Sequence, residues 1–242
     1  MSECIHGLEI PLCDICYPKA QPEKPAPVRR TASPRTSRVA GVNTSRKSID
    51  PAQQRVYHVT HIRNLEEILE SGEIRADATP VVDLSTDLTR ELRQTAEVTP
   101  ERSVAGYVPF FLAPTATVWD DLRRGAADET RWSAAARSSA PFDFVVLVST
   151  VARLGEGVII TDGDAAGSLT RFWSGDDVTP ALTALHDSES LDAAEVLAPG
   201  TVLYEAVQLI GVANDRVRDR VRELSTGGTK VAVYPPWFQP AE

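Results

Sequence analysis

Four residues near the N-terminus have the types and spacing of a metal site. The pairs Cys4-x-His6 and Cys13-x-x-Cys16 supply four sulfur and nitrogen donors, the number that a closed tetrahedral zinc site needs. All three cysteines of the chain lie here, and an odd number argues against a disulfide framework. We expect a structural zinc knuckle over residues 1–18. The alternatives are a redox Cys-x-x-Cys pair, for which the βαβ context is missing, and cysteines without a role.

The remainder of the chain lacks the familiar catalytic signatures. It contains no Walker phosphate loop, no Gly-x-Ser-x-Gly elbow, no His-Glu-x-x-His motif and no cysteine after Cys16. What is left is His58 in an apolar strand-like segment, several arginines and scattered carboxylates. By themselves these residues indicate only an α+β domain with a metal-binding appendage.

Three blocks of sequence, in a fixed order, carry a recognisable pattern. They are Tyr57-His58-Val59-Thr60-His61-Ile62-x-Asn64-Leu65 continuing to Gly72, then Tyr107-Val108-Pro109-Phe110-Phe111, then Ala194-Glu195-Val196-Leu197-Ala198-Pro199. Over roughly residues 56–238 the chain resembles the DarT family of DNA ADP-ribosyltransferase toxins. The resemblance implies an NAD-dependent enzyme that attaches ADP-ribose to a base in single-stranded DNA. It also implies a partner, a macrodomain-type antitoxin hydrolase that removes the mark.

The first block is expected to form the cofactor pocket. The resemblance implies that His58 binds NAD through its ribose or amide side, and that Thr60, Asn64 and Leu65 shape the same pocket. The alternative for His58 is a half-buried strand histidine whose hydrogen bonds are satisfied within the protein.

An arginine between the first two blocks is expected to hold the NAD phosphates and to take part in catalysis. A guanidinium presents a planar, permanently charged fork that suits a phosphate. Counting back from Tyr107, and matching Ala96-Glu97-Val98 to a similar stretch of the family, selects Arg93. Arg90, one helical turn earlier, is the alternative, and either could be an ordinary surface arginine.

Glu195 is the expected catalytic carboxylate. When nicotinamide leaves NAD, the anomeric carbon becomes oxocarbenium-like, and a nearby carboxylate stabilises that charge. The same group can accept the proton that the attacking base nitrogen releases. Its neighbours Ala194 and Val196 are apolar, so a charged side chain there needs a partner or a purpose. An edge-strand carboxylate facing water is the alternative, and Glu205 is the next candidate.

The DNA base itself is left open by the sequence. Four aromatic residues are candidates for stacking on bases, although aromatic residues at such positions are usually core: Tyr107, Phe110, Trp173 and Trp237. The second block lacks the Gly-Gly and His-Asp that often precede it in the family, and Leu112-Ala113-Pro114 replaces a more aromatic continuation. Thymine and guanine are therefore both possible targets.

The elements that must position these residues follow from hydrophobic patterning. Residues 56–62 read as a strand that runs into a helix over residues 65–70, with Asn64 as its N-cap and Gly72 after its end. Further strands are expected at 107–112, 144–148, 158–161, 195–197 and 231–234, and helices at 118–124, 178–185 and 215–224. This irregular mixture predicts an α+β domain. The resemblance specifies a split mixed β-sheet core with flanking helices.

The charge is unevenly distributed along three predicted zones, which are the knuckle at 1–18, a linker at 19–50 and a transferase domain at 51–242. The linker carries eight basic and two acidic residues, whereas residues 51–242 hold 17 basic and 29 acidic ones. The net charge of −9 argues against a protein that coats duplex DNA. The linker is expected to be disordered, and is either a flexible tether or a basic arm that contacts DNA phosphates.

Two other functional classes stay open at this stage. One is a related transferase that acts on RNA or protein. The other is a catalytically silent, zinc-containing nucleic-acid-binding module. The sequence has neither a run of about 18 apolar residues nor a secretory signal at its start, so a cytoplasmic protein is expected.

Overall fold

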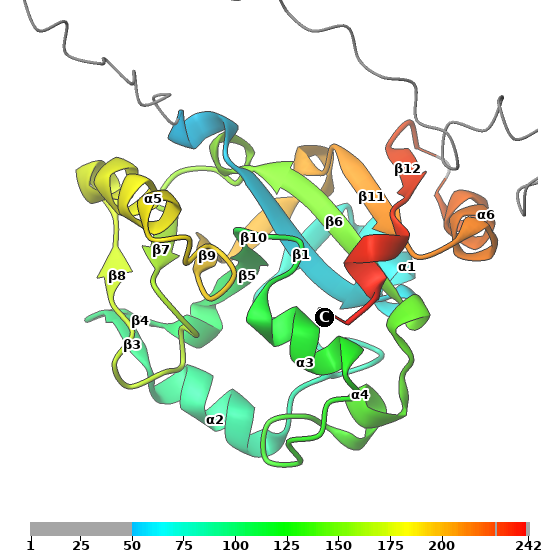
Figure 1. Ribbon diagram of the computed structural model, residues 1–242, viewed down its shortest axis with the longest axis horizontal. Helices are drawn as coiled ribbons and strands as arrows, with labels where there is room; N and C mark the ends of the chain where they lie inside the picture. Colours follow the sequence, from blue (N-terminus) through cyan, green and yellow to red (C-terminus); the bar gives the residue numbers. More distant parts are fainter. Residues whose placement is uncertain (1–49, 226, 241–242) are drawn as a thin grey trace, which may run out of the picture. The chain divides into compact units, whose positions relative to one another are not determined.

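The computed structural model describes residues 50–225 and 227–240 (Figure 1). The described residues all belong to one compact unit. Nearly all of the basic linker lies outside the described residues. So do the proposed zinc ligands Cys4, His6, Cys13 and Cys16. Among the described residues no helix has the length and apolar character needed to cross a membrane.

One large mixed sheet organises the described residues. Its eight strands lie in the order β12-β11-β6-β1-β5-β9-β7-β8, and every neighbouring pair is antiparallel except β11 and β12. The strands are β1 (Arg55–His61), β5 (Tyr107–Phe111), β6 (Phe144–Thr150), β7 (Ile159–Thr161), β8 (Phe172–Trp173), β9 (Glu195–Pro199), β11 (Leu209–Val212) and β12 (Lys230–Val233). The predicted α+β class with a mixed sheet is confirmed.

The sheet is nearly split between β1 and β5. Strand β1 pairs with β6 over seven residues, but it pairs with β5 only through Tyr57 and Phe111. Pro109 offers a physical reason. Its carbonyl faces β1, where it meets the His58 ring, and in an antiparallel strand a residue's N–H and carbonyl point the same way. Proline has no N–H, so β5 cannot donate a backbone hydrogen bond to β1 at this position.

Helices cover both faces of the sheet. They are α1 (Ile62–Ser71), α2 (Asp87–Thr95), α3 (Thr117–Arg123), α4 (Ala134–Ser138), α5 (Val178–Asp187) and α6 (Asp215–Leu224). Two small sheets pair β2 (Glu73–Arg75) with β10 (Thr201–Leu203) and β3 (Glu97–Thr99) with β4 (Arg102–Ser103). Helix α6 has its predicted bounds.

The predicted cap of helix α1 is wrong. The helix begins at Ile62, and the His61 side chain accepts the Arg63 N–H at its start. Asn64 lies inside the first turn with a buried amide. Gly72 does end the helix in a left-handed conformation, with φ of 71°, which glycine adopts without steric cost.

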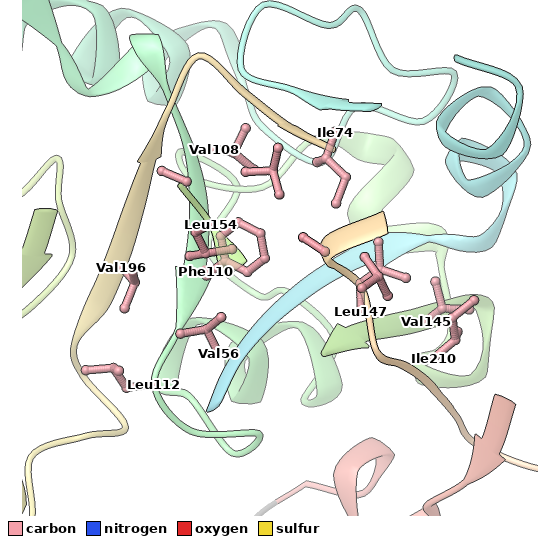
Figure 2. Close-up of a cluster of buried hydrophobic side chains, with 14 of the residues drawn as sticks. Val56, Ile74, Val108, Phe110, Leu112, Val145, Leu147, Leu154, Val196 and Ile210 are labelled. Atoms are coloured by element: carbon pink, nitrogen blue, oxygen red, sulfur yellow. The ribbon is translucent and has the colours of Figure 1, made fainter. Parts of the chain in front are cut away.

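Two apolar clusters occupy the two faces of the sheet. One contains Val56, Phe110 and Val196 (Figure 2). It also includes residues of α1, α5 and α6. The other contains Tyr57, Trp119 and Phe144 with the C-terminal Phe238, beneath α3 and α4. Because side chains alternate along a strand, the paired residues Tyr57, Phe111 and Glu195 form one row on the second face.

Candidate functional site

Arg93 and Glu195, 102 residues apart in sequence, meet in the structure. Arg93 lies in the last turn of α2 and Glu195 begins β9. The Arg93 Nη1 atom is 3.8 Å from Glu195 Oε2, and the two side chains are only 20% and 4% exposed. Arg90 instead forms ion pairs with Asp83 and Asp87 at the surface. The geometry therefore favours Arg93 over Arg90 as the site arginine.

The pair has unused hydrogen-bonding capacity. Arg93 Nη2 and Glu195 Oε2 are both buried, and neither has a hydrogen-bond partner among the described residues. Buried polar atoms of this kind are rare in folded proteins and call for an explanation. A polar substrate that accepts from the guanidinium and interacts with the carboxylate would satisfy both atoms.

The Glu195 carboxyl group has an unusual proton affinity. Burial raises its pKa from 4.5 to about 7, and the neighbouring Arg93 offsets part of that rise. Asp164 raises the pKa further, whereas a backbone hydrogen bond from Ala165 and the charge of Arg131 lower it. Near neutral pH the group can therefore exchange a proton with a bound substrate, which is what a general base requires.

The backbone around Glu195 is fixed from two sides. Glu195 pairs with Phe111 of β5, and the Glu195 N–H donates to the Thr161 hydroxyl at 3.0 Å. That hydroxyl donates to the Gly163 carbonyl at 2.7 Å. The flanking Ala194 and Val196 are fully buried on the opposite face. Strand pairing and one buried hydroxyl thus fix the backbone from which the carboxylate projects.

His58 lies at the split in the sheet next to Tyr57, and its side chain lies on the face of the first apolar cluster, opposite the row that ends in Glu195. Its Nδ1 is 2.8 Å from the Pro109 carbonyl, and its ring contacts Phe110 at 5.4 Å between centroids. Burial lowers its pKa, with the Pro109 contact offsetting part of the effect. A neutral ring that donates from Nδ1 to a carbonyl leaves Nε2 as an acceptor. Among the described residues no hydrogen bond joins His58 to Arg93 or Glu195.

The other predicted pocket residues contact the segment before α2 or pack in the core. The Asn64 amide accepts the Val82 N–H at 2.8 Å and donates to the Val82 carbonyl at 3.0 Å and to the Thr60 hydroxyl at 3.3 Å. It thereby anchors residues 76–86, the segment that leads into α2 and Arg93. Leu65 is fully buried in the main apolar cluster, so its side chain packs in the core and presents no surface to a cofactor.

Several other candidates lie away from the pair. Glu205 is exposed in a short 3₁₀ turn at Tyr204–Ala206. Tyr107 and Phe110 are buried in the core, 5% and 0% exposed, so neither ring can stack on a base. Trp173 and Trp237 are half-buried. No group of three or more His, Cys, Asp or Glu side chains suited to a metal occurs within residues 50–225 and 227–240.

Two residues that sequence reasoning missed complete the surroundings of Glu195. Arg131 and Asp164 form an ion pair of 2.6 Å, and both charges act on the Glu195 carboxyl group. Neither residue belongs to the three sequence blocks that carry the resemblance. Two surface hollows lie elsewhere, one of about 370 Å³ beside Arg75 and Arg102 and one of about 330 Å³ beside Arg222 and Lys230. Neither reaches His58, Arg93 or Glu195.

Comparison with known proteins agrees with this arrangement. Residues 57–239 match the family described as "ssDNA thymidine ADP-ribosyltransferase, DarT". A DNA ADP-ribosyl transferase of Mycobacterium tuberculosis is 26% identical over 216 residues, covering 75% of this chain and 86% of that protein.

Solved structures give the same fold. The DarT of Thermus sp. 2.9 in complex with ADP-ribosylated ssDNA superposes with a TM-score of 0.65 at 20% identity, covering 77% of this chain and 97% of that one. Thermosipho africanus DarTG in complex with ADP-ribose gives 0.59 at 18% identity, covering 76% of this chain and 51% of that one. With most of its described residues matched to one family in sequence and to that fold in space, the chain belongs to the DarT family of DNA ADP-ribosyltransferases.

Proposed function

We propose that this chain transfers ADP-ribose from NAD to a thymine base in single-stranded DNA. The buried Arg93–Glu195 pair, with an unpartnered polar atom on each side, is the observation that carries the proposal. The family description names single-stranded DNA and thymidine. The Thermus relative was solved with NAD⁺ and with ADP-ribosylated ssDNA.

Glu195 is assigned two tasks in the transfer. The bond between the NAD ribose and nicotinamide breaks, and nicotinamide leaves with the bonding electrons. The ionised carboxylate stabilises the positive charge that develops on the ribose carbon. A new bond then forms to a base nitrogen, which in thymine is the ring N–H not joined to the sugar, and Glu195 accepts the released proton.

Arg93 is assigned to the NAD phosphates and to the electrostatics of Glu195. Its Nη2 has no partner among the described residues, so the guanidinium keeps a donor for a phosphate oxygen. Its charge also favours the ionised form of Glu195. Because the Glu195 side chain is only 4% exposed, substrate binding requires movement of the groups that cover the pair.

His58 is assigned to the NAD ribose. A neutral imidazole with Nδ1 bound to Pro109 offers Nε2 as an acceptor for a ribose hydroxyl. Thr60 and Asn64 shape the pocket through the Val82 segment. Leu65, fully buried, would act only by holding α1 against the sheet.

A mass-spectrometric assay tests the reaction. The full chain and Glu195→Gln are incubated with NAD and oligonucleotides whose only variable base is thymine or guanine, as single strands and duplexes, with RNA and bulk protein in parallel. The proposal requires a gain of one ADP-ribose on the single strand with thymine, abolished in Glu195→Gln. A gain on guanine alone would correct the base. A gain on RNA or protein alone, or binding with no gain anywhere, would reject the assigned activity.

The wider biological role is also proposed. A base modification on single-stranded DNA would block replication, so the chain would act in the cytoplasm as a toxin, with a macrodomain-type hydrolase as its antitoxin. The Thermosipho relative is titled DarTG and holds ADP-ribose. Growth arrest on expression of the wild type, absent with Glu195→Gln and relieved by a hydrolase that removes the mark, is the required result.

The N-terminal cysteines and histidine are proposed to bind one structural zinc ion. The support is their donor types and spacing alone, Cys4-x-His6 and Cys13-x-x-Cys16. Metal analysis of the purified chain should give about one zinc per molecule. A Cys13→Ser/Cys16→Ser variant that keeps full occupancy would refute the site.

A further inference from the structure

An ion pair at the edge of the site joins two segments that surround Glu195. Arg131 Nη2 donates to Asp164 Oδ2 at 2.6 Å, and the side chains are 30% and 34% exposed. Arg131 lies just before α4, and Asp164 lies in the turn between β7 and β8. Each segment makes further contacts that lead directly to the Arg93–Glu195 pair.

On one side, Asp164 fixes the turn that faces the carboxylate. Its Oδ1 accepts the Ala166 N–H at 3.0 Å, and its carbonyl accepts the Gly167 N–H at 2.8 Å and the Thr170 hydroxyl at 2.6 Å. The next residue, Ala165, is fully buried, and its N–H is hydrogen-bonded to the Glu195 carboxyl group. The Asp164 carboxylate is therefore bound within the same turn that presents the Ala165 N–H to Glu195.

On the other side, the backbone around Arg131 is bound to the start of α2. The Arg131 carbonyl accepts the Thr86 N–H at 3.3 Å and the Thr89 hydroxyl at 2.9 Å. Thr86 is the N-cap of α2, and the following Trp132 pairs with Ser85 in a β-bridge. Helix α2 carries Arg93 in its last turn. Arg131 thus connects the helix that carries the arginine to the turn that contacts the glutamate.

We propose that Arg131 and Asp164 form a positioning pair that sets the separation and mutual orientation of Arg93 and Glu195. Neither residue is assigned contact with NAD or DNA. The pair acts through α2 on one side and the 162–171 turn on the other. This inference rests on the proposed function of Glu195, and the test below separates failure of the one from failure of the other.

The two members of the pair have opposite electrostatic effects on Glu195. The charged groups that face its carboxyl are Arg93 from α2, Arg131 from before α4 and Asp164 from the turn, together with the Ala165 N–H. Asp164 raises the pKa of Glu195 and Arg131 lowers it. Removal of one member leaves the other charge uncompensated, so Asp164→Asn should lower that pKa and Arg131→Gln should raise it. An ion pair too far away to act on the charge of Glu195 would not produce shifts of opposite sign.

The experiment uses the full chain in five forms. They are the wild type, Asp164→Asn, Arg131→Gln, the exchanged Arg131→Asp/Asp164→Arg and, as a control, Arg137→Gln, which breaks the surface ion pair with Glu129. For each, kcat and KM for NAD and the pH profile of kcat/KM are measured. We expect kcat to fall by roughly tenfold or more in both single variants, with acid midpoints displaced in opposite directions. The exchanged variant should recover part of kcat, and the control should match the wild type.

A second measurement does not depend on activity. Each form is also made with Glu195→Gln, and the pH at which the difference in melting temperature between the two members of each couple levels off reports the pKa of Glu195 in the folded chain. If no form transfers ADP-ribose, the proposed function fails, and the melting data alone decide whether the pair controls Glu195. The proposal would be overturned if the Glu195 midpoints of Asp164→Asn and Arg131→Gln equal that of the wild type by both measurements and kcat stays close to the wild-type value.

Discussion

At the scale of single residues, the energetics of Glu195 oppose stability. A carboxyl group taken out of water is costly to ionise unless partners compensate it. Here the cationic partner Arg93 stands at 3.8 Å without a hydrogen bond to Oε2. The group therefore keeps a pKa of about 7, a value useful for proton transfer and unfavourable for the folded state at high pH.

The first prediction concerns the pH dependence of transfer. The reaction needs the ionised carboxylate, so kcat/KM should rise with pH and level off above a midpoint near the Glu195 pKa of about 7. Glu195→Gln should lower kcat by about 100-fold or more at every pH and abolish this rise. Steady-state kinetics between pH 5 and 9 check it. A profile that is flat across pH 7 in the wild type would contradict the assignment.

The second prediction concerns stability. The pKa of Glu195 is raised from 4.5 to about 7 in the folded chain. The folded state therefore keeps the full stability of the protonated group below pH 4.5 and loses it as the pH rises through about 7. A shift of this size corresponds to about 3 kcal/mol. Glu195→Gln should therefore gain stability over the wild type by about that amount between pH 4 and pH 8. Urea unfolding at the two pH values measures it, and a constant difference would argue against the raised pKa.

The third prediction separates the two candidate arginines. Arg93→Gln removes the charge that favours ionised Glu195 and the free donor for a phosphate, so kcat/KM should fall by at least about 100-fold and the acid midpoint should move upward. Arg90→Gln removes exposed contacts with Asp83, Asp87 and the Ser85 carbonyl and should change kcat/KM by no more than about twofold. The reverse order of effects would transfer the role to Arg90.

At the scale of elements, the segment before α2 decides where Arg93 stands. Helix α2 has no buried residue of its own, so core packing does little to fix it. Its position depends instead on hydrogen bonds, from Asn64 to Val82 and from Thr86 and Thr89 to the chain around Arg131. Polar connections of this kind specify geometry where apolar contacts are few.

Asn64→Ala tests this dependence. The change leaves the buried N–H and carbonyl of Val82 without their partner, at a cost of about 2 kcal/mol, and it should lower kcat at temperatures where the chain is still folded. Asn214→Ala is the matched control, because Asn214 caps α6 away from the site. It should cost about 1 kcal/mol and leave kcat unchanged. Equal effects of both variants on kcat would remove Asn64 from the positioning of α2.

The sequence predicted elements well where burial follows a regular period. Val217 and Val221 repeat at helical spacing in α6, and Phe110 and Val196 lie in strands close to their predicted bounds. Helix α2 was not among the predicted helices, because its leucines Leu88 and Leu92 are about half exposed and give no core-facing signal. Arg131 and Asp164 belong to no motif, and only the folded chain brings them to Glu195.

At the scale of the whole molecule, the split sheet explains how a site forms from distant segments. Strands β6 and β1 belong to one half and β5 and β9 to the other, joined by the single pair Tyr57 and Phe111. His58 lies on one side of the junction and Glu195 on the other, and α2 brings Arg93 to Glu195. The residues proposed to bind the NAD ribose and to carry out chemistry therefore come from different halves of one sheet, and no short motif can contain them all.

The whole-molecule prediction concerns how an acidic domain holds an anionic strand. Residues 51–242 carry 29 acidic and 17 basic residues, whereas residues 19–50 carry eight basic and two acidic ones. If the basic segment binds phosphates, removing residues 2–49 should weaken single-stranded DNA binding at low salt. It should also make the salt dependence shallower, by about 0.7 in the log–log slope for each phosphate that is no longer neutralised. Fluorescence titrations between 50 and 300 mM salt measure the slope, with NAD hydrolysis without DNA as the control for an intact site. An unchanged slope would leave the segment as a tether and assign DNA binding to the transferase domain alone.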